Sequence, residues 1–237
     1  MSTLNRLGAG LLLVLAATGA LAAPESRVYT PGPFERLEVD GSAEIKLVQG
    51  DRDQIIVPGG DEVQQLLEIR LSGNRLRINP GGGWKFWNSA RLQIEVQMRQ
   101  PTHVTLSGNS DLHAAGPIKG EELLVSISGA GLARFDELNV GRLRLDISGA
   151  GDAQLAGQVD NLSLGVSGKG KVLAEPLRVR SASVTISGVG NASLWVTENL
   201  RVSVSGIGSV DYWGQPSVKR SISGVGNVTA RGDKQPR

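Results

Sequence analysis

Acidic side chains are the first candidates for chemistry in this 237-residue chain, because a pair of carboxylates can cleave a glycosidic bond. Such a pair must lie on one face. Four aspartates expected to face outward never recur at the same position of neighbouring repeats: Asp111, Asp146, Asp152 and Asp211. A pair could still assemble from connecting segments, for instance Asp136 and Glu137 with Asp160.

Metal-ligating residues are scarce. His103 and His113 are the two histidines of the chain, with Asp111 as the one carboxylate close by, and there is no cysteine. The step from Gly149 to Asp152 is similar to calcium-binding repeats, and Ca²⁺ needs six or more oxygens. Five other repeats have no acidic residue at the position of Asp152, where they carry Leu132, Lys171, Asn191, Ser209 and Asn227. We therefore expect no metal and no other cofactor.

Aromatic side chains are the strongest indication of a binding site. Trp195 and Trp213 each stand eight residues after the serine of a Ser-Gly step, with Tyr212 alongside, and Trp84 and Trp87 follow three glycines. Exposed aromatic surfaces suit sugar rings and protein partners. The alternative is that the tryptophans cover connecting segments and that the Trp84 loop folds onto the N-terminal region.

The elements that position these residues form a repeat. Ser-Gly occurs seven times between residues 107 and 226, at intervals of 18 to 21 residues. Apolar residues stand one, three and five positions before these serines and five and seven positions after them, with Thr102 and Arg220 as the exceptions. This alternation predicts two strands per repeat, each with one buried face. A connector of five to seven residues with single apolar residues, such as Leu138, then leads to the next repeat.

A short, near-constant period indicates a solenoid, in which each repeat buries its apolar face against its neighbours. About 19 residues are too few for a βαβ unit. We therefore expect an all-β, right-handed parallel β-helix of about seven coils of 18 to 21 residues, the hand following from the rule for parallel crossovers. The glycines are expected to provide positive φ and to remove Cβ clashes between stacked corners.

The rest of the chain organises around this array. Residues 1–22 have the pattern of a secretory signal peptide, with an uncleaved anchor as the alternative. Residues 23–100 predict a β-rich cap, with a strand and corner at 37–47, a hairpin across Gly50, a helical turn at 61–67 and two strands about Gly73. Residues 101–230 are the regular repeats and 231–237 a polar tail.

Steps such as Ser148-Gly149-Ala150-Gly151-Asp152-Ala153, the opening Phe34-Glu35-Arg36-Leu37 and the turn Val48-Gln49-Gly50-Asp51 carry a family resemblance. The chain resembles the bacterial auto-transporter adhesin, head GIN domain family over residues 34–230. The resemblance implies a right-handed β-helix in an exported envelope protein, and it brings no catalytic or binding residues.

These observations favour a non-enzymatic scaffold or adhesion module in the periplasm or at the cell surface, with a glycan or an envelope protein as partner. The alternatives are a polysaccharide lyase or hydrolase, and an oligomer joined through open coil edges. A mature net charge near zero without basic runs argues against nucleic acid. No second apolar stretch predicts a membrane span after signal cleavage.

Overall fold

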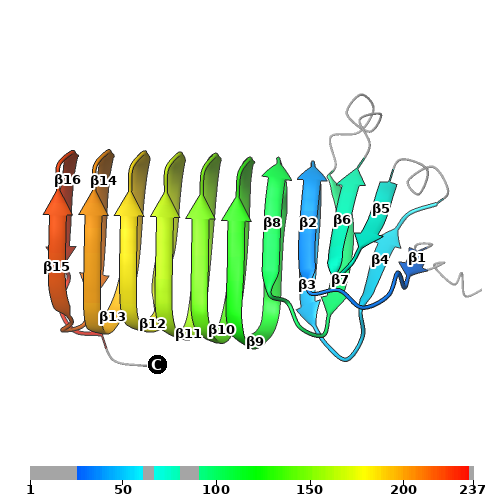
Figure 1. The fold of residues 1–237 in the computed structure, drawn as a ribbon, viewed down its shortest axis with the longest axis horizontal. Helices are drawn as coiled ribbons and strands as arrows, with labels where there is room; N and C mark the ends of the chain where they lie inside the picture. The colour runs from blue at the N-terminus through cyan, green and yellow to red at the C-terminus, as the bar shows by residue number, and fades with distance from the viewer. Residues whose placement is uncertain (1–25, 61–66, 81–90, 235–237) are drawn as a thin grey trace, which may run out of the picture.

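The computed structural model describes residues 26–60, 67–80 and 91–234, and the described residues contain β-strands and no helix. The signal peptide, residues 61–66 of the helical turn expected at 61–67, and the loop with Trp84 and Trp87 lie outside the described residues. The chain forms an all-β solenoid of about six turns, close to the seven expected (Figure 1). The right-handed sense of winding stays a prediction.

Strands stack in parallel along the solenoid. The N-terminal strands are β1 (Ser26–Tyr29), β2 (Arg36–Gly41), β3 (Ala43–Gln49), β4 (Gln54–Pro58), β5 (Leu67–Ser72), β6 (Arg75–Pro80), β7 (Leu92–Met98) and β8 (His103–Gly108). The remaining strands are β9 (Asp111–Ile127), β10 (Ala130–Ile147), β11 (Ala150–Val166), β12 (Lys169–Ile186), β13 (Val189–Val204), β14 (Ile207–Trp213), β15 (Ser217–Ile222) and β16 (Val225–Ala230).

The expected connectors are themselves strand. Each of β9 to β13 is a single bent strand of 16 to 18 residues that runs from one Ser-Gly corner to the next. The bend is the continuous lower edge in Figure 1, where register shifts such as that between Phe135 and Leu138 absorb the varying repeat length. The backbone hydrogen bonds between coils therefore continue through the connector. The single apolar residues of the connector, such as Leu138, also point into the core.

The core is the set of apolar columns predicted from the alternation. Along β10 and β11, for example, Leu145, Ile147, Ala153 and Leu155 are at most 2% exposed. The connector residue Leu138 is 1% exposed. One predicted core position of the final coil fails, since Ile222 is 39% exposed. Arg220, a charged residue in the corresponding column, is exposed as well. Both lie on β15, which pairs with β13 and, within the described chain, has no strand on its other side.

The corner glycines act by removing Cβ atoms. A Cβ on Gly188 would lie 2.0 Å from the carbonyl oxygen of Gly168 in the coil before it. The expectation of positive φ is wrong for six of the seven Ser-Gly corners, since Gly108 alone among these seven has it, at 85°. Close backbone approach between coils, and not backbone conformation, therefore explains the repeated glycine.

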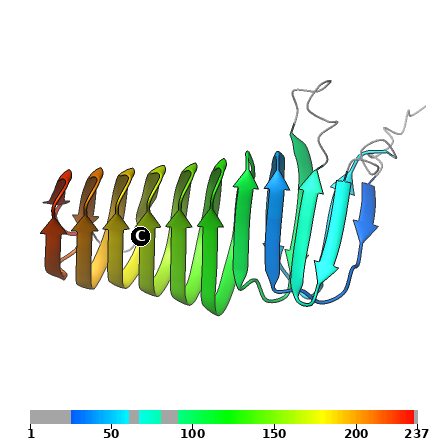
Figure 2. The ribbon, with the colours of Figure 1, turned by 45° about the horizontal axis from the view of Figure 1, so that its top comes forward.

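The N-terminal region stacks out of chain order. β2 pairs in parallel with both β6 and β8, and β3 with both β7 and β9, so residues 36–49 form a coil between the β6–β7 coil and the first regular repeat. The hairpin expected across Gly50 is wrong, because β7 lies between β3 and β4. The strands predicted about Gly73 are confirmed as the antiparallel pair β5–β6. Figure 2 shows these strands, with β1 and β4, at the end of the solenoid opposite β16.

Candidate functional site

Asp or Asn stands four positions after the corner serine in four of the seven repeats, and three of these side chains have a structural role. The backbone N–H of Lys171 donates to Asp152 Oδ1 at 2.7 Å, and that of Leu132 donates to Asp111 Oδ1 at 2.8 Å. Asn191 Oδ1 accepts from Ser209 N in the same way, at 3.2 Å. These side chains therefore bridge successive coils, which accounts for the Asn or Asp in the repeated motif. Asp152 meets Lys171 through the backbone N–H, and the ion pairs of the described residues do not include one with the Lys171 ammonium.

Asp136 and Asp160, two of the three connector carboxylates considered for catalysis, are paired with basic side chains. His113 Nε2 lies 2.7 Å from Asp136 Oδ2, and Arg134 Nε donates to Asp136 Oδ1 at 2.7 Å. The hydrogen bonds from His113 and then Arg134 hold the pKa of Asp136 below its ordinary value. Asp160 lies 3.8 Å from Arg180. A carboxylate whose pKa is lowered is a poor general acid near neutral pH.

The two histidines do not meet. His103 Nδ1 contacts Thr102 Oγ1 at 3.0 Å, whereas His113 faces Asp136. Burial, with the nearby positive charge of Arg36 second, lowers the pKa of His103. Within residues 26–60, 67–80 and 91–234, no group of three His, Asp or Glu side chains could hold a metal ion.

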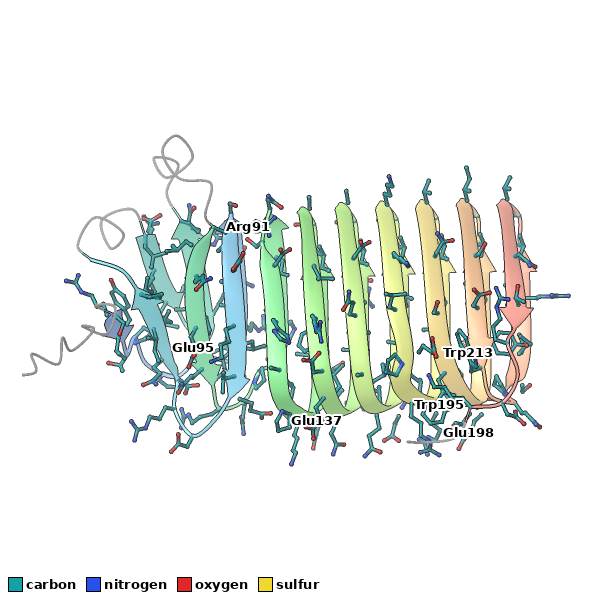
Figure 3. All side chains as sticks on the ribbon, turned by 180° about the vertical axis from the view of Figure 1, so that it is seen from behind. Arg91, Glu95, Glu137, Trp195, Glu198 and Trp213 are labelled. Carbon is teal, nitrogen blue, oxygen red and sulfur yellow. The ribbon has the colours of Figure 1, made fainter. Side chains whose placement is uncertain are left out.

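The predicted aromatic site is a closed corner near the C-terminal end. The backbones of Trp195 on β13 and Trp213 on β14 are register partners, and both side chains lie at the lower bend (Figure 3). Trp195 is only 7% exposed, whereas Trp213 and Tyr212 are partly buried. Trp195 therefore offers almost no ring surface to a ligand in this conformation.

The tail covers this corner. Lys234 Nζ lies 5.9 Å from the Trp195 ring centroid and 5.8 Å from that of Trp213. The same ammonium donates to Glu175 Oε1 at 2.8 Å and to the Glu175 carbonyl oxygen at 3.0 Å. Gly214 N–H donates to the Gly232 carbonyl oxygen at 2.9 Å, which extends the pairing into the tail. The expected polar tail thus packs on the solenoid as far as Lys234.

A second surface, which the sequence interpretation missed, lies on the strand segments before the corners. We call it the serine groove. Its cavity of about 500 Å³ crosses β10, β11, β12, β13 and β15 and also touches Glu122 on β9. Its outward-facing side chains are Arg142 and Arg144, Asn161 and Ser163, Ser181 and Ser183, Asn199 and Arg201, and Ser217 and Lys219.

Short residues make the floor and long cations make the two walls. Ser163 and Ser183 are register partners on neighbouring strands, and Asn199 Nδ2 donates to Ser181 Oγ at 3.1 Å. The sequence signal was present four residues before each corner serine, where Ser163 and Ser183 stand in the middle repeats and Arg144, Arg201 and Lys219 in the outer ones. Aligning the repeats on the corner serine gives the same register as the structure.

Fold and site together define a β-solenoid with a polar surface suited to binding. The chain belongs to the family described as "Putative auto-transporter adhesin, head GIN domain", whose model matches residues 33–216. The resemblance inferred from the corner motifs is thereby confirmed. No match was found among the curated proteins.

Several solved structures share the fold. A "putative adhesin" from Bacteroides fragilis has a TM-score of 0.82 at 23% identity, covering 88% of this chain and 97% of the other. A "putative lipid binding protein" from Parabacteroides distasonis has a TM-score of 0.67 at 20% identity, covering 88% and 98%. A "putative adhesin" from Parabacteroides merdae has a TM-score of 0.60 at 19% identity, covering 88% and 97%. In the described part of this chain, no helix could cross a membrane.

Proposed function

We propose that this protein is a non-enzymatic adhesion or binding module that is exported to the bacterial envelope, in the periplasm or at the cell surface, and holds an extended carbohydrate. The observation that carries this proposal is the serine groove, which presents hydroxyl and amide groups at the same position of successive coils. Its volume is in the range of small-molecule sites. Membership of an adhesin family agrees with a binding role.

Two features favour binding over cleavage. Asp136 and Asp160 are paired with His or Arg side chains, and Glu122, which lines the serine groove, lies 3.9 Å from Arg142. No second carboxylate of the described residues lines that groove, whereas glycoside cleavage needs two. The competing function, a polysaccharide lyase or hydrolase, has a smaller hollow of about 270 Å³ in its favour, which Asp160 and Glu198 line. Both carboxylates lie against Arg180, at 3.8 and 4.0 Å.

A glycan array with the purified protein tests the proposal, together with an assay for new reducing ends or unsaturated products on every polymer that binds. We expect binding without turnover. Turnover of a bound polymer would establish the enzyme, and no binding to any glycan would refute a carbohydrate partner.

The same array separates the two candidate surfaces. We expect Trp195→Ala and Trp213→Ala to leave glycan binding intact, because the tail covers that corner. Ser183→Tyr would fill the groove floor and should abolish binding. If instead the tryptophan variants lose binding and the Ser183 variant retains it, the aromatic corner and not the serine groove is the site.

A further inference from the structure

The C-terminal wall of the serine groove carries two adjacent cations. Arg201 on β13 and Lys219 on β15 are register partners, and both are exposed. Like charges directly opposite each other on neighbouring strands are destabilising. Among the ion pairs of the described residues, none includes Arg201 or Lys219. The fold therefore places two cationic side chains, neither of them in an ion pair among the described residues, on backbones that are one strand spacing apart.

The opposite wall differs. Arg144 Nε donates to Asp146 Oδ2 at 2.6 Å, and this bond raises the pKa of Arg144. Arg142 lies 3.9 Å from Glu122. Both N-terminal cations thus have an acidic neighbour, so the charge of the groove is concentrated at its C-terminal end. An anion there would relieve the repulsion between Arg201 and Lys219.

The floor between the walls is neutral and uniform. Ser163, Ser183 and Arg201 occupy one column on three successive strands, because Ser183 is the register partner of both others. Hydroxyls at this spacing can donate to and accept from the hydroxyls of a sugar chain. From β10 to β15 the groove crosses four strand spacings, roughly 19 Å at about 4.8 Å each. A single small anion would use one end of it, whereas a chain can follow its whole length.

We propose that the serine groove binds an acidic polysaccharide along the solenoid axis, with its anionic groups at Arg201 and Lys219 and its neutral hydroxyls on Ser163 and Ser183. This inference rests on the proposed function and specifies its ligand class. Nucleic acid fits less well, because no aromatic side chain of the described residues lines the groove to stack a base.

The test compares acidic polymers (polygalacturonate, alginate and heparin) with neutral ones (dextran, mannan and fully methyl-esterified polygalacturonate) by calorimetric titration. The variant R201S/K219S replaces both cations with the residue that stands at this column in the middle coils. The matched control K169S/K171S removes two exposed lysines on β12 that have no ion pair among the described residues. Both variants change the net charge equally. Thermal unfolding followed by circular dichroism checks that each folds.

We expect acidic polymers to bind, R201S/K219S to weaken binding at least tenfold, and K169S/K171S to leave it unchanged. Binding should also weaken as salt is raised. R201S/K219S should unfold at the same or a slightly higher temperature than the wild type, because it removes a like-charge contact.

Other outcomes refute the inference in distinguishable ways. Equal binding of neutral and acidic polymers, unaffected by R201S/K219S, overturns the anionic ligand and leaves the proposed carbohydrate partner standing. Equal loss in both double variants shows general charge attraction and overturns the groove. Groove-dependent binding to vesicles of phosphatidylglycerol or to single-stranded DNA, without polysaccharide binding, replaces the ligand class. No binding to any polysaccharide refutes both proposals.

Discussion

Replacing Gly188 by alanine should unfold the solenoid at a much lower urea concentration. The new Cβ would lie 2.0 Å from the carbonyl oxygen of Gly168 and 2.4 Å from that of Ser167. Both obstacles are backbone atoms, so no side-chain rotation can relieve the clash. Gly188 does not have positive φ, so the expected loss comes from contact with the neighbouring coil and not from backbone strain.

The size of the expected loss in stability follows from the backbone groups that must move apart. Separating the two corners weakens three backbone hydrogen bonds: Ser187 N to Val166 O at 2.8 Å, Gly188 N to Val166 O at 3.2 Å and Val189 N to Gly168 O at 2.8 Å. Overpacking costs about 1–3 kcal/mol, and each lost hydrogen bond costs about 1 kcal/mol. We expect a loss of about 4 kcal/mol in the free energy of unfolding.

The assay is urea unfolding followed by far-ultraviolet circular dichroism, with Gly120→Ala as the matched control. Gly120 lies in β9 with ordinary φ, and a Cβ there would meet nothing within 4 Å. Alanine is better than glycine inside a strand, so the control should be neutral or stabilised by up to about 1 kcal/mol. A Gly188→Ala protein within 0.5 kcal/mol of the wild type (about the measurement error) would refute the close approach of the corners.

Three further predictions concern the C-terminal tail, the exposed edge strand β15 and the loss of stability at low pH. Lys234→Met should release the tail from Glu175 and both tryptophans, and lower the free energy of unfolding by about 1 kcal/mol. In a Trp84→Phe/Trp87→Phe background, acrylamide should then quench tryptophan fluorescence more strongly than in the protein with Lys234. Unchanged quenching would show that Lys234 does not cover Trp195. Arg220→Val removes a charge from the exposed edge strand β15 and should lower the protein concentration at which light scattering detects oligomers. Equal scattering from the variant and the wild type would argue against association through this edge. The pKa of Asp136 is lowered in the folded state, so its contribution to stability is present above the ordinary aspartate pKa of about 4 and is lost as the pH falls through the lower folded value. Asp136→Asn should therefore unfold at a lower urea concentration than the wild type at pH 7 and show a smaller further drop at pH 3; parallel losses in the two proteins would contradict the shift.

The repeats could be predicted because the same alternation of apolar and polar residues recurs in each coil. Leu145, Ile147 and Ala153 are buried where the alternation places them, since a one-residue slip would expose the whole column. At the last coil the pattern continues but the covering neighbour is missing, so Ile222 reads as core and is 39% exposed. Burial depends on the next coil as well as on the residue.

Non-local pairing could not be predicted. The alternation of β2 and β3 shows strands but does not specify their partners, so nothing in the sequence indicated that residues 36–49 lie between β6–β7 and the first repeat. Trp195 and Lys234 likewise meet through a tail whose path depends on the pairing of Gly214 with Gly232. The serine groove was hidden because its residues are individually ordinary and gain meaning only from their shared register.

The core columns and the serine groove both depend on the parallel register of neighbouring coils, and a designed cross-link tests that register directly. The chain has no cysteine, so Ser163→Cys/Ser183→Cys introduces the only thiols. These residues are register partners on β11 and β12, and the strand spacing of about 4.8 Å is within the range of Cα separations that a disulfide spans. The control Ser163→Cys/Arg201→Cys places the thiols two strands apart, roughly 10 Å, which is beyond that range. Oxidation should remove the free thiols of the first variant within the monomer and leave those of the second. Two reactive thiols in the first variant, or an equally complete cross-link in both, would contradict the stacking of the coils.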